Sequence, residues 1–209
     1  MTGINALADA LRVSASLTSL LLRGSNLGVE GAKALATGLA ASASLTSMDI
    51  SGNALCGVQF GHGTYDATGI TALAGALGVC ASLTSLDVSG NNEDEEGMRA
   101  LGEALLASTS SKLINLKCSK LHLKAEATSL NVDNQGLGPG GAVLIAAATT
   151  KFMASLTVLD LSRNGLGSEG GGDGGGGRAG PARRGCEVVS GQGRAGLGRL
   201  RLRRLWGGL

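Results

Sequence analysis

The sequence predicts an α/β solenoid with disordered residues after it: a curved stack of repeated layers with an inner parallel sheet and outer helices. A short pattern returns along the chain, most clearly as LTSMDISGN from Leu45, LTSLDVSGN from Leu83 and LTVLDLSRN from Leu156. A longer self-match joins GINALADALRVSASLTSL (3–20) to GITALAGALGVCASLTSL (69–86), with fourteen of eighteen positions identical. The 209 residues include four aromatic side chains, which suits thin repeated layers better than one large core.

Each copy begins with a segment that alternates like a strand. In the copy that begins at Leu83, this alternation predicts that Leu86 and Val88 face inward while Asp87 faces outward. An asparagine follows each strand where the chain must turn, and its amide can bond backbone groups that would otherwise lack a partner. The asparagines assigned to this position are Asn26, Asn53, Asn91 and Asn164.

The second half of each copy changes to helical spacing. Apolar residues recur three and then four positions apart, which predicts a helix with one apolar stripe. The stripes consist of Ala32, Leu35 and Leu39; Ile70, Leu73 and Leu77; and Met98, Leu101 and Leu105. One strand and one helix cannot bury a core alone, so neighbouring units must stack. Because a helix is about 10 Å wide and strands lie about 4.8 Å apart, the strands take the concave side.

The predicted solenoid spans residues 1–169, with about five to six strand–helix units. It includes an insertion at 54–65 and degenerate repeats at 113–155, where LINLKCSK and ATSLNVDNQGLG are weaker copies of the strand pattern. Residues 170–209 form a Gly/Arg-rich tail predicted to be disordered, because each glycine costs a helix about 1 kcal/mol relative to alanine.

The segment LTSLLLRGSNLGVEGAKALA (17–36) resembles the leucine-rich repeat of the ribonuclease-inhibitor type. The segments CGVQFGHGTYDATGI and LKCSKLHLKAEATSLNVDNQGLGPGGAVLIAAA are similar to insertions and degenerate repeats of algal or protist proteins in this class. The resemblance covers roughly 3–170 and implies the solenoid fold. It implies no particular partner, because such repeats serve many functions.

The outward strand positions are the predicted partner-binding site on the concave face. They are Asp49, Asp87, Asn131 and Asp160, with Leu21 and Lys117 at the matching places in two other copies. Three aspartates on one line favour a basic partner, and the alternative is a solvated strand face. The insertion supplies a second candidate contact through Phe60, His62 and Tyr65. Phe60 and Tyr65 can also simply pack the loop onto the edge of the repeat.

Catalytic and metal chemistry find little support in the sequence, so we expect no enzyme activity, cofactor, metal or small-molecule substrate. GLGPGG (136–141) lacks the spacing and the Lys-Ser/Thr of a phosphate-binding loop. The acidic block NNEDEEG (91–97) suits a helix N-terminus. No cysteine pair has zinc-ligand spacing, and Cys56, Cys80 and Cys118 are expected to be small buried residues.

Charge divides the chain, since residues 1–170 carry a net charge of −4 and residues 171–209 carry +6. The basic segment LGRLRLRRLW (197–206) suits an anionic membrane or RNA. The other readings of the tail are a disordered extension without a role and translated non-coding sequence. With no signal peptide or membrane-spanning run, the expected location is cytoplasmic.

The function predicted from these observations is a non-catalytic protein–protein interaction module with an unknown protein partner. One alternative is a GTPase-activating repeat protein that uses Arg23 or Arg163. Another is an adaptor whose basic tail contacts a membrane or RNA. A third is a fragment of a longer product. Neither end of the repeat array has a polar cap, which predicts self-association.

Overall fold

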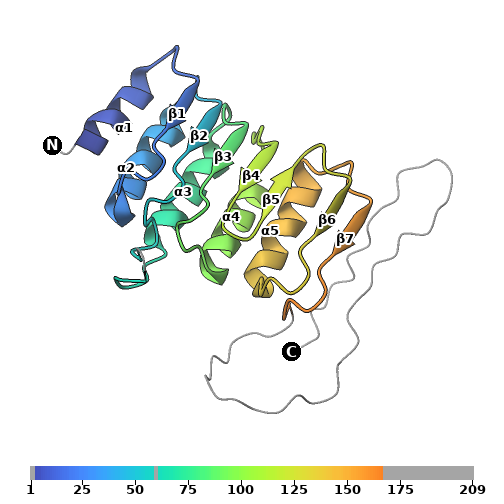
Figure 1. The fold of residues 1–209 in the computed structure, drawn as a ribbon. Coiled ribbons are helices and arrows are strands. Elements are labelled where there is room, and N and C mark those ends of the chain that lie inside the picture. The colour runs from blue at the N-terminus through green and yellow to red at the C-terminus, as the bar shows by residue number, and fades with distance from the viewer. Residues whose placement is uncertain (1–2, 59–60, 167–209) are drawn as a thin grey trace, which may run out of the picture.

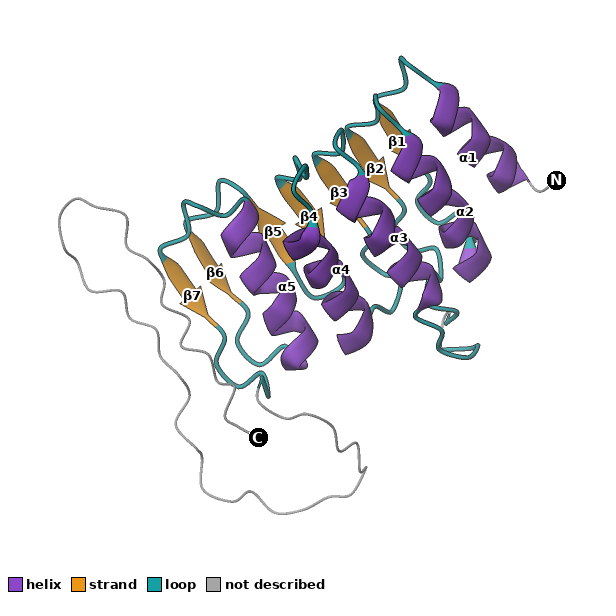
Figure 2. Cartoon of the chain, turned by 180° about the vertical axis from the view of Figure 1, so that it is seen from behind, coloured by secondary structure: helices purple, strands orange, loops and turns teal. Residues whose placement is uncertain are grey.

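The computed structural model describes residues 3–58 and 61–166. Its helices are α1 (Gly3–Val13), α2 (Gly28–Ala41), α3 (Thr68–Val79), α4 (Glu95–Ala107) and α5 (Gly138–Lys151). Its strands are β1 (Ser19–Leu21), β2 (Ser47–Asp49), β3 (Ser85–Asp87), β4 (Asn115–Lys117), β5 (His122–Lys124), β6 (Ser129–Asn131) and β7 (Val158–Asp160). The strands form one layer, and the helices pack against one face of it (Figures 1 and 2). This arrangement confirms the α/β solenoid.

The core lies between these two layers. β1 to β4 are parallel and in register, so that Leu20, Met48, Leu86 and Leu116 form one inward row. Every residue of the three predicted helix stripes is also buried. The alternation and the helical spacing therefore place the right side chains inside, because every second residue of a strand and every third or fourth residue of a helix lie on the same face.

The sheet departs from the predicted parallel order at the degenerate repeats. β5 runs antiparallel to β4, and β6 and β7 form a separate two-stranded sheet. The backbones of Cys118 and Leu121 bond each other in a tight turn, and Leu121 and Leu123 are buried beneath it. A hairpin therefore follows β4 where the other repeats have a helix (Figure 1).

Asn53 joins three segments of backbone. Its side chain is fully buried, and Nδ2 donates to the carbonyl oxygens of Leu22 at 2.7 Å and Ile50 at 2.9 Å. Its Oδ1 accepts from the amides of Ser25 at 2.7 Å and Leu27 at 3.4 Å. One amide thus bonds backbone groups of its own turn and of the turn of the preceding repeat, and buried backbone groups need such partners.

The same contact recurs in two other repeats. Asn91 Oδ1 accepts from the amide of Asn53 at 2.6 Å, and Asn164 Oδ1 accepts from that of Gln135 at 2.9 Å. Both side chains are buried, which confirms the predicted role of these asparagines.

The assignment of Asn26 to this series is wrong. Asn53 lies eight residues after Leu45, and the residue eight positions after Leu17 is Ser25. Asn26 is exposed and adopts the left-handed conformation with φ 54°, the same backbone conformation that Ala54 has in the next repeat. Asparagine is common there because it tolerates that backbone region better than most residues do.

Glu93 joins two repeats where the asparagine series stops. In this copy the position of the asparagine, eight residues after Leu113, is occupied by Leu121. The repeat therefore offers no side-chain amide at this turn. Instead, Glu93 Oε2 accepts from the Ser119 amide at 3.3 Å and from its hydroxyl. Oε1 is buried and has no partner among the described residues. Burial raises the pKa of Glu93, although the Ser119 bonds act in the opposite direction.

We expect Asn53→Ala to lower the free energy of unfolding by about 3 kcal/mol or more, because it leaves several buried backbone groups without partners. Asn26→Gly is the matched control, since glycine adopts the left-handed conformation freely and the site is exposed. Urea denaturation of both variants measures the difference. Equal effects of the two substitutions would contradict the role assigned to Asn53.

Glu93 should make stability depend on pH. The pKa of Glu93 is raised in the folded state, so Glu93 contributes fully to the free energy of unfolding below the ordinary glutamate pKa of about 4.3. That contribution is lost as the pH rises through the folded-state pKa. Compared with Glu93→Gln, the natural chain should therefore be relatively more stable near pH 4 than near pH 7.5. Ser119→Ala should increase this loss. Urea denaturation at both pH values measures the free energy of unfolding of the natural chain and of Glu93→Gln. The prediction is wrong if the stability of the natural chain relative to Glu93→Gln stays constant or grows as pH rises.

Candidate protein-interaction surface

The outer surface of β1 to β5 is called the strand face here. Two rows of side chains cross it at positions fixed by the strand register. The first row is Ser19, Ser47, Ser85, Asn115 and Lys124; the second is Leu21, Asp49, Asp87, Lys117 and His122. Neighbouring strands lie about 4.8 Å apart, so these side chains form a regular and closely spaced array.

Asp87 is charged, and a neighbouring cation compensates it. Lys117 Nζ lies 2.9 Å from Asp87 Oδ2, while Ser89 donates its amide to Oδ1 at 2.9 Å and also its hydroxyl. Partial burial opposes ionisation, but the bonds from Ser89 and Lys117 outweigh it and lower the pKa of Asp87. The pairing of Asp87 with Lys117 weakens its expected role as a free acidic contact.

Asp49 occupies the same place one strand earlier. Its Oδ1 accepts from the Ser51 amide at 2.9 Å and from the Ser51 hydroxyl at 2.6 Å. Within the described residues, no cation lies within ion-pair distance of it. Asp49 is therefore the predicted acidic residue of β1 to β4 that keeps an uncompensated charge.

The β5 end of the strand face is basic. His122 and Lys124 extend it beyond Lys117, and His122 Nε2 lies 3.0 Å from Asn115 Oδ1. Burial, and then the charges of Lys124 and Lys117, lower the pKa of His122 and favour its neutral form. Sequence reasoning missed His122 and Lys124, although the alternation in LHLK was a usable strand signal.

Asn131 and Asp160 do not continue the line of Asp49 and Asp87. They pair with each other across β6 and β7, in the second sheet. Asp160 Oδ1 accepts from the Ser162 amide at 3.0 Å, and hydrogen bonding to Ser162 lowers the pKa of Asp160. The predicted single line of acidic residues is thus split by the hairpin.

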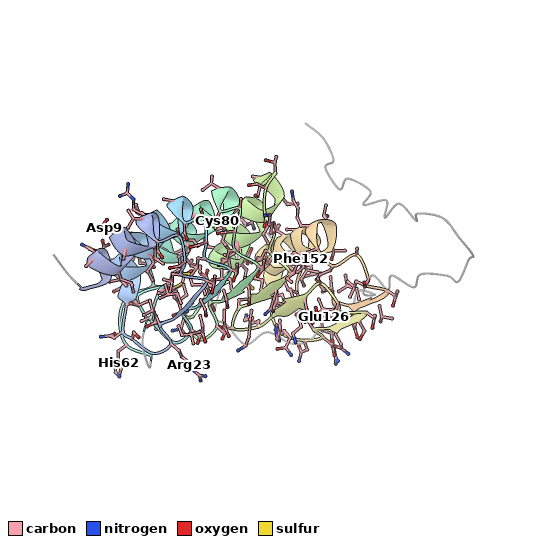
Figure 3. The ribbon with its side chains drawn as sticks, turned by 90° about the horizontal axis from the view of Figure 1, so that it is seen from above. Asp9, Arg23, His62, Cys80, Glu126 and Phe152 are labelled. Atoms are coloured by element: carbon pink, nitrogen blue, oxygen red, sulfur yellow. The ribbon has the colours of Figure 1, made fainter. Side chains whose placement is uncertain are left out.

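The two arginines considered for GTPase activation lie in different settings. Arg163 Nε donates to Asp133 Oδ1 at 2.8 Å, so it joins the turns after β6 and β7. Arg23 is exposed and extends from the strand side of the molecule (Figure 3).

The first residues of the predicted insertion 54–65 pack into the core. Leu55 and Cys56 are fully buried in the core, so the chain leaves the repeat only at Gly57. Phe60 lies outside the described residues. His62 is exposed and extends from the strand side (Figure 3).

Tyr65 anchors the insertion to the next repeat. Its hydroxyl donates to Asp94 Oδ1, and the same oxygen caps α4 by accepting from the amides of Glu96 at 2.9 Å and Gly97 at 3.1 Å. Burial, and then this bond to Asp94, raise the pKa of Tyr65. Tyr65 thus bonds to the next repeat and is still 37% exposed, and His62 is exposed as well, so the predicted loop contact stays a prediction.

The three described cysteines are free and buried. Burial raises the pKa of Cys56 to about 12 and that of Cys118 to about 11, which suppresses thiolate chemistry. Cys186 lies outside the described residues. Across residues 3–58 and 61–166, no group of three or more His, Cys, Asp or Glu side chains is placed to hold a metal. None of the described helices is long and apolar enough to cross a membrane.

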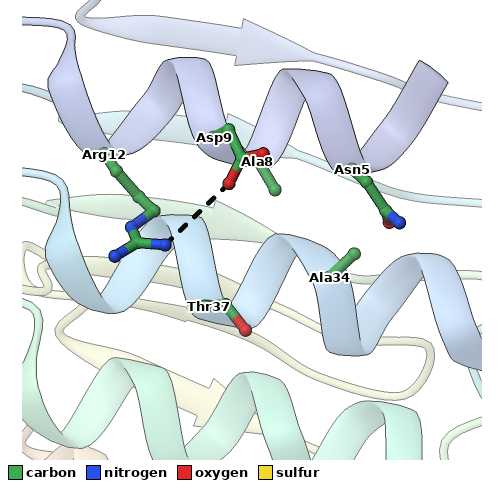
Figure 4. Close-up of a pocket in the computed structure, with 6 residues that line it drawn as sticks. All are labelled: Asn5, Ala8, Asp9, Arg12, Ala34 and Thr37. Atoms are coloured by element: carbon green, nitrogen blue, oxygen red, sulfur yellow. Dashed lines mark ion pairs between the residues drawn. The ribbon is translucent and has the colours of Figure 1, made fainter. Parts of the chain in front are cut away.

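The helix side carries an open hollow between α1 and α2 (Figure 4). Asp9 and Arg12 form an ion pair at 3.9 Å on its rim, above Ala34 and Thr37. This hollow is separate from every residue predicted as a binding site.

Comparison with known proteins supports the repeat assignment. The sequence profile described as "Leucine Rich repeat" matches residues 13–36, 79–102 and 153–172. No curated protein is significantly similar in sequence. The ribonuclease-inhibitor subtype therefore stays a prediction.

Solved structures resemble the chain in fold. "Leiomodin-1 Actin-Binding Site 2 (ABS2)" is 14% identical, with a TM-score of 0.51, and the match covers 77% of this chain and 79% of that one. The tropomodulin C-terminal domain of Caenorhabditis elegans is 16% identical, with a TM-score of 0.47, and the match covers 77% of this chain and 83% of that one. The three matched repeats and the layered strand–helix fold show that the chain is a leucine-rich-repeat protein.

Proposed function

We propose that the chain is a non-catalytic, cytoplasmic interaction module and that its strand face binds a partner protein. The proposed module spans residues 1–169, and the Gly/Arg-rich tail predicted for residues 170–209 lies outside the described residues. The observation that carries the proposal is the change of charge along the strand face, from uncompensated Asp49 on β2 to Lys124 on β5. These side chains stand on strands whose register fixes their spacing, which favours recognition of a matching charge pattern.

The partner should carry a basic group opposite Asp49 and an acidic group opposite Lys124. Leu21 continues the row beside Asp49 and is 71% exposed, so it offers an apolar contact at one end. The described strand face presents no aromatic or arginine side chain on β1 to β5, and such residues usually supply the strongest contacts of an interface. We therefore expect binding of moderate affinity that weakens as salt increases.

The leiomodin-1 structure is described as an actin-binding site, and it shares this fold at low identity. It supports the proposal that the solenoid serves protein binding. It does not identify the partner, because the same fold carries many functions.

Charge reversal on the strand face should weaken partner binding. Affinity capture with the full chain from its source organism identifies a partner, and titration calorimetry then measures its affinity. We expect Asp49→Lys and Lys124→Glu each to weaken binding by about tenfold or more. Glu103→Lys, an exposed reversal on α4, is the matched control and should bind like the natural chain. Full binding by both strand-face variants, or equal weakening by the control, would contradict the proposal.

A further inference from the structure

The strand layer is interrupted inside the fold, between β5 and β6. β1 to β5 form one sheet, β6 and β7 form another, and no hydrogen bond pairs β5 with β6 within the described residues. The two strands are nevertheless neighbours in both ribbon views (Figures 1 and 2). The helix layer continues across this place, since α4 and α5 pack against each other. The interruption therefore concerns the strands alone, and described structure lies on both sides of it.

The open edge of β5 is formed by the backbone of His122 and Lys124. The amides of Leu121 and Ala125 donate to residues that flank β4, at 3.3 and 2.8 Å. Alternate residues of an antiparallel strand bond the same neighbour, so the backbone groups of His122 and Lys124 point away from β4 and toward β6. The Lys124 carbonyl also accepts from the Ala127 amide at 3.1 Å, in the turn that follows β5.

The open edge of β6 is formed by the backbone of Ser129 and Asn131. The Thr128 carbonyl accepts from an amide of β7 at 3.2 Å, and the Val132 amide donates to a carbonyl of β7 at 3.0 Å. Ser129 and Asn131 alternate with these residues, so their backbone groups point away from β7 and toward β5. Both residues are exposed. Two open edges thus face each other in the interior of the repeat array.

The two edges stand further apart than paired strands do. Most of the Cα pairs between β5 and β6 are separated by more than 8 Å. Paired strands lie about 4.8 Å apart, so one strand added between two others requires about 9.6 Å. Lys120 Nζ donates to the Gly136 carbonyl at 2.8 Å and joins the turns on either side. We call the facing edges of β5 and β6, with the space between them, the sheet break.

We propose that the sheet break binds an extended segment of a partner protein, which adds a strand between β5 and β6. Main-chain hydrogen bonds to an open sheet edge are a recurring way to bind a peptide. Here an added strand meets backbone amides and carbonyls on both sides, because successive residues of a strand point to opposite neighbours. The inference goes beyond the strand-face proposal, since it uses backbone edges rather than side-chain charges alone, and either can fail without the other.

The side chains beside the sheet break indicate which segment fits. On the inner side, Leu123 is fully buried and Leu130 is partly buried against the core, so an inward side chain of the segment should be apolar. On the outer side, His122 and Lys124 stand on β5, with Glu126 in the following turn. The two basic side chains outnumber the acidic one and favour acidic outward side chains. The expected segment therefore alternates apolar and acidic residues.

Titration of the full chain with a synthetic peptide, followed by NMR, tests the proposal. The probe is a short peptide that alternates valine and glutamate. We expect saturable binding that slows exchange of the His122, Ser129 and Asn131 amides by about tenfold or more, because these amides gain partners. The same peptide with methyl groups on alternate backbone nitrogens is the matched control. It keeps the side chains but loses donors, so it should bind about tenfold or more weakly.

Two substitutions in the protein give a second readout. Ser129→Pro removes the edge amide without removing a bond to β7, and it should abolish peptide binding. Ser129→Ala keeps the amide and should bind like the natural chain. Asp49→Lys, which tests the strand face, should also leave peptide binding unchanged, so the two proposals are distinguished. Circular dichroism checks that each variant keeps the fold.

Four results would overturn the proposal, and the peptide results do not depend on how any variant folds. The first is no binding of the glutamate peptide up to about 1 mM. The second is equal binding of the N-methylated peptide, which would show a contact through side chains alone. The third is binding without slower exchange at Ser129 and Asn131. The fourth is full binding by folded Ser129→Pro.

Discussion

Three turns of this solenoid depend on the side-chain amide of an asparagine that belongs to the following repeat. Asn53 holds the backbone around Ser25, and Asn91 holds that around Asn53. A buried backbone group without a partner costs free energy comparable to a lost hydrogen bond. A repeat is therefore incomplete without its neighbour, and this dependence acts in one direction along the chain. The apolar residues follow the same logic, since the leucines of each strand are covered by helices of adjacent layers.

The place where this series stops explains the most distinctive part of the molecule. Leu121 occupies the position of the asparagine, and the chain turns back as β5 rather than forming another helix. Glu93 accepts a hydrogen bond from the Ser119 amide there, and its carboxyl group is buried with Oε1 unpartnered among the described residues. The hairpin also brings Lys124 onto the strand face. The break in the repeat is thus the source of the basic end of the proposed interaction surface.

Periodicity predicted the regular layers because their burial depends on neighbouring residues in the sequence. Leu86 faces inward and Leu101 lies in a buried helix stripe, as the spacing requires. The assignment of Asn26 was wrong because the first copy is shifted by one residue, so that Ser25 takes the place expected for Asn26. The other exceptions depend on contacts between distant segments. The line from Asp49 to Asp160 is split because the hairpin separates two sheets, and the pairing of Asp87 with Lys117 joins residues thirty positions apart.

Native-state hydrogen exchange of the Ser25 and Leu27 amides tests the central dependence most directly. Both bond to Asn53 Oδ1, at 2.7 and 3.4 Å, although they lie in a loop. The account predicts that they exchange as slowly as amides in the middle of α2, and that Asn53→Ala makes them exchange fast while α3 stays protected. Rapid exchange of both amides in the natural chain, or unchanged protection in Asn53→Ala, would contradict it.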